Sequence, residues 1–263
     1  MNIAVITGAS SGMGKDTLLL LEKEYQFDEI WAIARREDKL LQLQEHCKTK
    51  IRAIPLDLSK DESYYSYAKM LEEEKPNVKL LFNCSGFGKF GRIEKVPLID
   101  TLGMIDVNCK GYAAMTEITL PYMRENSQIL LLDSLSAFQP VPFMTTYGAT
   151  KAFVLSYGRA LREELKPRKI SVMIICPGWI TTEFFDRAWQ TNDDKVVNYY
   201  NKLYTSEQVA KQTIKDLKKG KKMSILGFGN KLQVLGVKIM PVGFVIRTWM
   251  RQQGHKNYAK DGK

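Results

Sequence analysis

The chain has 263 residues, 44% of them apolar and 26% charged, which is an ordinary composition for a soluble globular protein without low-complexity tracts. Its formal net charge of +10 is uneven. Residues 1–210 hold 26 basic against 27 acidic side chains, whereas residues 211–263 hold 13 against 2. Because the positive charge belongs to the C-terminal fifth, the composition argues against nucleic-acid binding by the body of the protein.

The first residues, "MNIAVITGAS", enter an apolar run at once, with no basic segment before it, which predicts a strand rather than a secretory leader. The cysteines show no metal-ligand spacing, and we expect reduced thiols, no metal site and a cytoplasmic location. They are Cys47, Cys84, Cys109 and Cys176.

Short apolar runs then alternate with helical patterns along the chain. The runs at 3–8, 29–34, 51–56, 79–84, 128–133 and 170–176 predict strands, and the segments 14–25, 60–75, 101–125 and 147–166 predict helices between them. Nearly continuous apolar strands suit a sheet that is covered on both faces. The pattern predicts an α/β fold with a doubly wound, Rossmann-like parallel sheet and a single domain over 1–263, comprising a core (1–205) and a C-terminal, partly helical extension (206–263).

A glycine-rich turn, "TGASSGMG" (7–14), follows the first predicted strand and opens a helix. Glycines at Gly8, Gly12 and Gly14 permit a tight turn and close approach of a ligand. The helix start then offers free N–H groups to a phosphate. The context predicts nucleotide binding, and the alternative is a tight turn that binds nothing.

The second predicted strand ends in "AIARRED", where NAD-binding folds usually carry an acidic residue for the ribose hydroxyls. Here Arg35 and Arg36 come first. Arg35 can pair with a 2′-phosphate, and Ser11 can add a hydroxyl, which favours NADP over NAD. The alternative is a pair of arginines solvated at a helix start.

The segment "YGATK" places Tyr147 and Lys151 four residues apart, on one helix face. A free tyrosine is a poor acid or base at neutral pH, and a nearby ammonium lowers the pKa of the phenol. The pair therefore predicts general acid–base chemistry. By itself, the same spacing also occurs on solvated helices.

These residues together resemble the short-chain dehydrogenases/reductases, in their NADP-preferring branch. The glycine turn matches the family pattern, as do "YGATK" and Ser134, which stands thirteen residues before Tyr147. Further matches are "NCSG" (83–86), "DVNCKG" with Asn108, "PLDLS" with Asp57, and "CPGWITTEF" (176–184) with Thr182. Cys84 and Ser85 depart from the family's Asn-Asn-Ala-Gly element, and the match fades beyond about residue 205.

The resemblance implies roles for four catalytic residues. Tyr147 would exchange the proton of the carbonyl/alcohol oxygen while NADP(H) transfers hydride. Lys151 would hold the nicotinamide ribose, Ser134 would fix the reacting oxygen, and Asn108 would order a water for proton relay. The implied cofactor contacts are Gly8, Ser10, Ser11, Gly12, Met13, Gly14, Arg35, Asp57, Asn83, Gly86, Tyr147, Lys151, Pro177, Gly178 and Thr182.

Apolar residues flank the catalytic positions in the segments 86–91 and 137–144. They predict a cleft for a bulky lipophilic carbonyl or alcohol, such as a hydroxysteroid-like compound or an acyl chain; alternatively, some of them pack beneath loops. The predicted substrate residues are Phe87, Phe90, Ser136, Phe138, Met144 and Trp179.

The tail "NKLQVLGVKIMPVGFVIRTWMRQQ" (230–253) mixes apolar and basic residues at roughly helical spacing, with Pro241 as an expected kink. Its charges argue against a membrane span. Three interpretations stay open: a helix packed on the domain, an oligomer contact, or a basic helix in weak peripheral contact with an anionic membrane.

Small residues recur every four positions at Ala152, Ser156 and Ala160, which fits either close helix packing within the fold or the contact of a homodimer or homotetramer. The leading hypothesis is an NADP(H)-dependent oxidoreductase acting on a carbonyl/alcohol pair. The alternatives are a non-catalytic NADP-binding sensor or scaffold, and a lipid-surface protein whose nucleotide site is vestigial.

Overall fold

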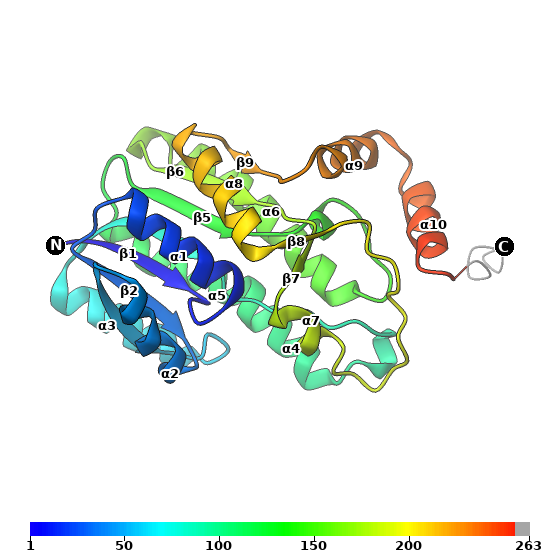
Figure 1. Cartoon of the computed structure of the whole chain (residues 1–263), viewed down its shortest axis with the longest axis horizontal. Helices are drawn as coiled ribbons and strands as arrows, with labels where there is room; N and C mark the ends of the chain where they lie inside the picture. Colours follow the sequence, from blue (N-terminus) through cyan, green and yellow to red (C-terminus); the bar gives the residue numbers. More distant parts are fainter. Residues whose placement is uncertain (256–263) are drawn as a thin grey trace.

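The computed structural model describes residues 1–255, so the last eight residues of the predicted C-terminal extension lie outside the described part. Within it, seven parallel strands form one sheet in the order β3-β2-β1-β4-β5-β6-β9 (Figure 1). The strands are β1 (Asn2–Thr7), β2 (Glu29–Ala34), β3 (Lys50–Pro55), β4 (Asn77–Asn83), β5 (Gln128–Leu132), β6 (Ser171–Ile175) and β9 (Met223–Ser224). The strand order reverses at β1 and β4, which is where ligands bind in open α/β sheets.

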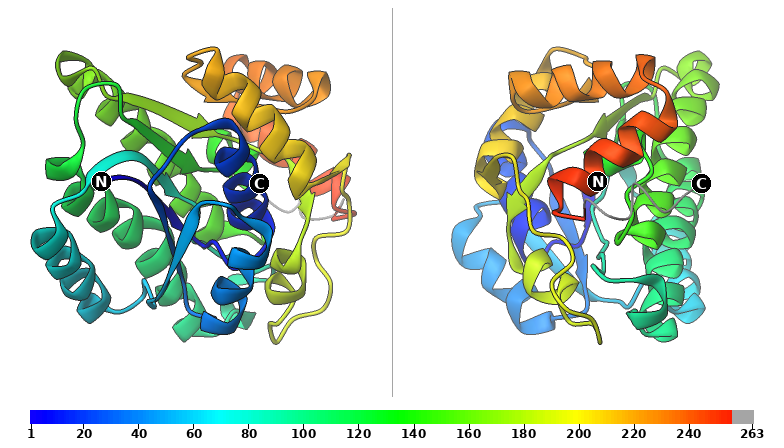
Figure 2. Two further views of the ribbon diagram at one scale, coloured as in Figure 1. Left: turned by 60° about the vertical axis from the view of Figure 1, so that its left-hand side comes forward. Right: turned by 90° about the vertical axis from the view of Figure 1, so that its right-hand side faces the viewer.

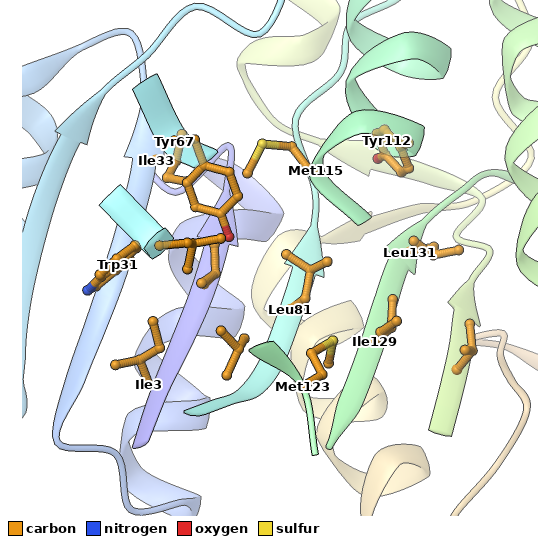
Figure 3. Close-up of a cluster of buried hydrophobic side chains, with 14 of the residues drawn as sticks. Ile3, Trp31, Ile33, Tyr67, Leu81, Tyr112, Met115, Met123, Ile129 and Leu131 are labelled. Atoms are coloured by element: carbon orange, nitrogen blue, oxygen red, sulfur yellow. The ribbon is translucent and has the colours of Figure 1, made fainter. Parts of the chain in front are cut away.

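Helices cover both faces of the sheet, as Figure 2 shows. One face packs on α3 (Asp61–Glu74), α5 (Gly111–Thr119) and α6 (Thr145–Glu164), and the other on α1 (Gly12–Glu24), α2 (Glu37–Leu41) and α8 (Ser206–Lys218). Figure 3 shows the first core, where Trp31, Tyr67, Tyr112 and Met115 fill the space between strands and helices. The predicted doubly wound architecture is confirmed.

The helix predicted at 101–125 is interrupted. It consists of α4 (Leu98–Ile105), a π-helical turn (Asp106–Lys110), α5 and a 3-10 turn (Leu120–Tyr122). π-turns insert one residue into a helix and often occur at functional sites, and this one holds Asn108. Further 3-10 turns are Gln42–His46, Ile93–Lys95, Leu135–Phe138 and Lys166–Arg168.

The remaining elements lie outside the seven-stranded sheet. They are β7 (Trp179–Thr181), paired in parallel with β8 (Leu203–Thr205), then α7 (Glu183–Ala188), α9 (Phe228–Ile239) and α10 (Val242–Gln252). The kink expected at Pro241 is a complete break between two helices, because Met240 before it is extended (φ −85°, ψ 145°), as the residue before a proline prefers. Among the helices of residues 1–255, none is both long and apolar enough to span a membrane.

Candidate active site

A cavity of about 730 Å³ lies at the carboxyl ends of the strands. It brings together the glycine turn after β1, the arginines after β2, and side chains from β5 and α6. Most of the predicted site residues line it: Gly8, Ser10, Ser11, Gly12, Met13, Gly14, Arg35, Asp57, Gly86, Phe87, Ser134, Ser136, Met144, Tyr147, Lys151, Pro177, Gly178, Trp179 and Thr182.

The glycine turn needs its glycines. Gly8 (φ +67°) and Gly12 (φ +49°) have left-handed backbones, which side chains rarely tolerate. A Cβ on Gly14 would lie 2.2 Å from the carbonyl oxygen of Gly8, so the first turn of α1 can approach β1 only without a side chain there. The resulting hollow at the start of α1 exposes backbone N–H groups, and its shape and polarity fit a dinucleotide phosphate.

Of the two arginines, Arg36 forms hydrogen bonds to the serines of the glycine turn. Its Nη2 donates to Ser11 Oγ at 2.8 Å and to Ser10 Oγ at 3.1 Å, and its Nη1 donates to Glu183 at the start of α7, also at 2.8 Å. Arg35, the arginine predicted for the 2′-phosphate, lines the same cavity, and its charge helps to lower the pKa of Asp57. Burial opposes that shift, and hydrogen bonds from Ser59 favour it more strongly than Arg35 does. The sequence signalled a basic pair but not which member faces Ser10 and Ser11.

Tyr147 is buried and hydrogen-bonded to Ser134, whose Oγ also accepts the N–H of Ser136 at 3.2 Å. Burial raises the pKa of Tyr147, and the Ser134 hydrogen bond only partly opposes this. The lowered phenol pKa predicted from Lys151 is therefore wrong for this structure. Lys151 Nζ lies 5.8 Å from the ring centroid of Tyr147 and donates instead to the carbonyl oxygen of Leu132 at 2.8 Å, while burial and the charge of Asp133 both raise the pKa of the phenol.

A carboxyl that sequence analysis missed lies beside these groups. Asp133 directly precedes Ser134, is 2% exposed, and lines the cavity. Its Oδ2 accepts from Cys176 Sγ at 3.7 Å, and its Oδ1 has no hydrogen-bond partner within residues 1–255. Burial raises the pKa of Asp133 to about 7, against the attraction of Lys151. Burial likewise lowers the pKa of Lys151, against the attraction of Asp133.

The side chains of both predicted asparagines form hydrogen bonds within the protein. Asn108 Nδ2 donates to Phe87 O at 2.9 Å and Thr150 Oγ1 at 3.0 Å, and its Oδ1 accepts the N–H of Phe87 at 3.1 Å. These bonds fix the segment after β4 against α6. Asn83 lies outside the lining, because its Nδ2 is directed inward to Thr116 Oγ1 at 2.9 Å. The cofactor contact predicted for Asn83 is therefore replaced by a structural bond.

Two predicted substrate residues also lie outside the lining. Phe90 is fully buried, with its ring edge-on to four aromatic rings at 5.0 to 6.2 Å between centroids. Three of these rings, those of Trp179, Phe184 and Phe185, line the cavity. Phe138 packs beneath Arg159 and Lys238. In their place, the wall includes residues that the sequence did not single out: Val141, Phe184, Phe185, Arg187, Gln233 and Trp249.

No group of histidine, cysteine or acidic side chains within residues 1–255 has the arrangement of a metal site. The four cysteines are free. A phosphate cradle at the switch point of a parallel sheet, and a Ser–Tyr–Lys set facing the same cavity, define a dinucleotide-dependent oxidoreductase.

The chain belongs to the short-chain dehydrogenase family, whose model matches residues 2–193. An uncharacterised oxidoreductase of Staphylococcus epidermidis is 29% identical over 182 residues, covering 68% of this chain and 78% of that protein. The 3-ketodihydrosphingosine reductase of Bos taurus is 28% identical over 251 residues, covering 90% and 75%. The solved short-chain dehydrogenase of Sphingobium yanoikuyae in complex with NADPH has a TM-score of 0.75 at 22% identity, covering 89% of this chain and 92% of that chain.

Proposed function

We propose that this oxidoreductase uses NADP(H) to transfer hydride to or from the carbonyl/secondary alcohol of a bulky lipophilic substrate. The observation that carries the proposal is that one cavity holds both the Arg36–Ser10–Ser11 cluster and the Ser134–Tyr147–Lys151 set. The NADPH in the Sphingobium yanoikuyae structure agrees with this choice of cofactor.

The 2′-phosphate of NADP is proposed to bind at Arg36. Two serine hydroxyls already hold the guanidinium at the edge of the glycine turn. The carboxylate of Glu183 occupies one of its donors, and hydrogen bonds from Lys39 and Arg36 lower the pKa of Glu183 to about 2. A phosphate can replace this carboxylate as the anion between Arg36 and Lys39, since both are oxyanions that accept charge-assisted hydrogen bonds.

The bound cofactor supplies the hydride, and the residues of the chain manage the proton. With its raised pKa, Tyr147 is a neutral phenol at neutral pH and can donate a proton to a carbonyl oxygen. Ser134 shares a hydrogen bond with this phenol and can hold the same oxygen in place. Lys151, which lines the cavity and donates from Nζ to Leu132 O, is proposed to hold the ribose hydroxyls.

The walls of the cavity favour a lipophilic substrate. Phe87, Met144, Trp179 and Trp249 face it, and Trp249 is fixed by a hydrogen bond from Nε1 to Pro142 O at 3.1 Å. Apolar walls with a few fixed polar groups are typical of sites for small apolar ligands. Of the two substrate types expected, the acyl-chain type has the additional support of the bovine relative, which is named for a ketosphingoid.

The cofactor proposal is tested by fluorescence titration of NADPH and NADH on the wild type, Arg36→Ala, Arg35→Ala and Glu183→Gln. Loss of Arg36 should weaken NADPH binding by about tenfold or more and leave NADH binding unchanged, because a charge-assisted hydrogen bond contributes about 1.5–3 kcal/mol. The matched Arg35→Ala variant should lose less, and Glu183→Gln should bind NADPH more tightly. Equal wild-type affinity for NADPH and NADH would show the assignment to be wrong.

The substrate proposal is tested by following NADPH absorbance with a panel of long-chain ketones, steroid ketones and small polar ketones. Turnover should be confined to the lipophilic members. Tight NADPH binding with no turnover of any member would favour the sensor or scaffold alternative.

We further propose a homodimer or homotetramer located in the cytoplasm, in part at the surface of a membrane. Ala152, Ser156 and Ala160 are exposed on α6 rather than packed within the chain, and Phe153 beside them is exposed as well. Sedimentation equilibrium of the wild type and of the Ala152→Gln/Ala160→Gln variant tests the contact. The bulkier side chains should lower the mass to that of a monomer, and an unchanged oligomer mass would place the contact elsewhere.

A further inference from the structure

The helix α9 carries an apolar stripe on its outer side. Phe228, Leu232, Leu235 and Ile239 follow each other at spacings of four, three and four residues, which places them on one face of an α-helix. Each of these side chains is at least half exposed. The inward side of the same helix is held by Val234, which packs beside Leu135 and Leu155. The stripe is therefore the face of α9 that no part of residues 1–255 covers.

The exposed apolar surface continues through the break at Pro241. Met240, Val242 and Phe244 are exposed in the turn and at the start of α10. Farther along α10, Val245, Trp249 and Met250 are buried, and Trp249 and Met250 pack in the cluster that includes Phe87, Met144 and Tyr147. Figure 1 shows α9 and α10 following each other at one edge of the molecule. We call this exposed set the C-terminal apolar surface. Its members are Phe228, Leu232, Leu235, Ile239, Met240, Val242 and Phe244.

The charges around this surface are all of one sign. Lys231 and Lys238 flank the stripe on α9, and Arg247 and Arg251 are exposed on α10. Residues 217–255 contain eight lysines and arginines and no aspartate or glutamate. The contrasting apolar patch on α4, with Leu98, Ile99 and Leu102 exposed, is interspersed with acidic residues such as Asp100.

We propose that the C-terminal apolar surface docks the protein on an anionic membrane. Exposed apolar side chains enter the boundary between headgroups and acyl chains, and the flanking lysines and arginines meet the acidic headgroups. A second copy of this chain would present the same positive charges to the surface, so like charges would face each other in a symmetric contact. An anionic lipid layer is complementary to both the apolar and the charged features.

The docking surface adjoins the substrate side of the cavity. Gln233, next to Leu232 on α9, and Trp249 on α10 both line the cavity. The two helices thus present one side to the reacting substrate and the other to the proposed lipid layer. A lipophilic substrate dissolved in that layer would reach the cavity past these helices without crossing bulk water. The docking proposal stands independently of the cofactor and of the reaction.

The test is co-sedimentation of the full chain with phosphatidylcholine vesicles, with and without phosphatidylserine. Binding should depend on phosphatidylserine and fall when salt is raised to about 0.5 M, where charges are screened beyond a few ångströms. The Lys231→Gln/Lys238→Gln variant should bind at least about tenfold more weakly, since each basic residue near an anionic leaflet contributes roughly a fivefold gain. The Leu235→Gln/Ile239→Gln variant should lose about tenfold or more, through lost apolar burial.

A matched control removes the same kind of side chain elsewhere. Leu235 and Ile239 are 57% and 75% exposed, and Leu41 and Leu98, on α2 and α4, are 60% and 70% exposed. The Leu41→Gln/Leu98→Gln variant should bind vesicles as the wild type does. Circular dichroism and NADPH affinity establish that each variant is folded.

Two results would overturn the proposal. One is equal sedimentation with anionic vesicles, neutral vesicles and no lipid. The other is a Leu235→Gln/Ile239→Gln variant that binds vesicles like the wild type; a simultaneous change in its sedimentation-equilibrium mass would assign the surface to a second copy of the chain.

Discussion

Replacing Asp133 by asparagine should make the pH dependence of stability flatter. In the wild type, burial raises the pKa of this carboxyl from 3.8 to about 7. A group whose pKa is raised on folding contributes its full stability below the unfolded pKa and loses it as pH rises through the folded pKa. The wild type should therefore lose stability between pH 4 and pH 7, and the neutral amide should not.

The size of this effect follows from the shift. Between the two pKa values the slope is about 1.4 kcal/mol per pH unit and it halves at the folded pKa, so the carboxyl alone accounts for about 2 kcal/mol between pH 5 and pH 7. In a protein of this size that corresponds to a change of about 4 °C or more in Tm. Lys151 changes the difference in Tm between variant and wild type in the same direction. Without Asp133 the pKa of Lys151 falls further, so rising pH stabilises the variant relative to the wild type.

The measurement is thermal unfolding of both proteins at pH 5, 6, 7 and 8, read as the difference in Tm between variant and wild type. Asp216 gives a matched control. It is also 2% exposed, and although burial opposes the shift, hydrogen bonds from Lys221 and other neighbours lower its pKa. The Asp216→Asn difference should be negative and constant over this range. Parallel Tm curves for Asp133→Asn and wild type would refute the reasoning.

Three further changes test the site. Tyr147→Phe should lower turnover by about a hundredfold to ten-thousandfold with cofactor affinity intact, because it removes only the transferable proton. Lys151→Ala should lower both turnover and cofactor affinity. Steady-state rates and cofactor titrations measure these effects, and near wild-type turnover of Tyr147→Phe would contradict the mechanism. Gly14→Ala should abolish NADPH binding or destabilise the fold, because its Cβ would lie 2.2 Å from Gly8 O. With its raised pKa, Tyr147 should support reduction evenly from pH 6 to 8, whereas oxidation should rise with pH; identical profiles in both directions would argue against the neutral phenol.

The features that the sequence predicted well are those set by local patterns. Six strands were predicted within two residues of their observed ends, because buried parallel strands are short apolar runs. The glycine turn and the Tyr147–Lys151 pair were placed correctly in one cavity, because the carboxyl ends of parallel strands meet at one edge of the sheet. β9 was missed because it has only two residues, too few to show a period.

The features that were predicted wrongly depend on which way a side chain faces. Asn83 and Phe90 belong to plausible motifs, yet both are directed into the core by neighbours that are far away in sequence. The assignment of the 2′-phosphate to Arg36 rather than Arg35 is a proposal that rests on the hydrogen bonds of Arg36 to Ser10 and Ser11 across the turn. The sequence does not mark Asp133, because an isolated acidic residue at the end of a strand is usually solvated and only burial makes its charge costly.

The cavity is lined both by the part of the chain that the family model matches and by helices beyond it. The family match ends at residue 193, and it includes the phosphate cradle, Ser134, Tyr147 and Lys151. These groups are held by turns and helix starts at the edge of one sheet, so their geometry follows from the backbone. The far wall of the cavity comes from Gln233 and Trp249, on helices that lie beyond the match. We therefore propose that α9 and α10, whose outer sides form the C-terminal apolar surface, contribute to substrate choice together with Phe87, Met144 and Trp179 from the matched part of the chain.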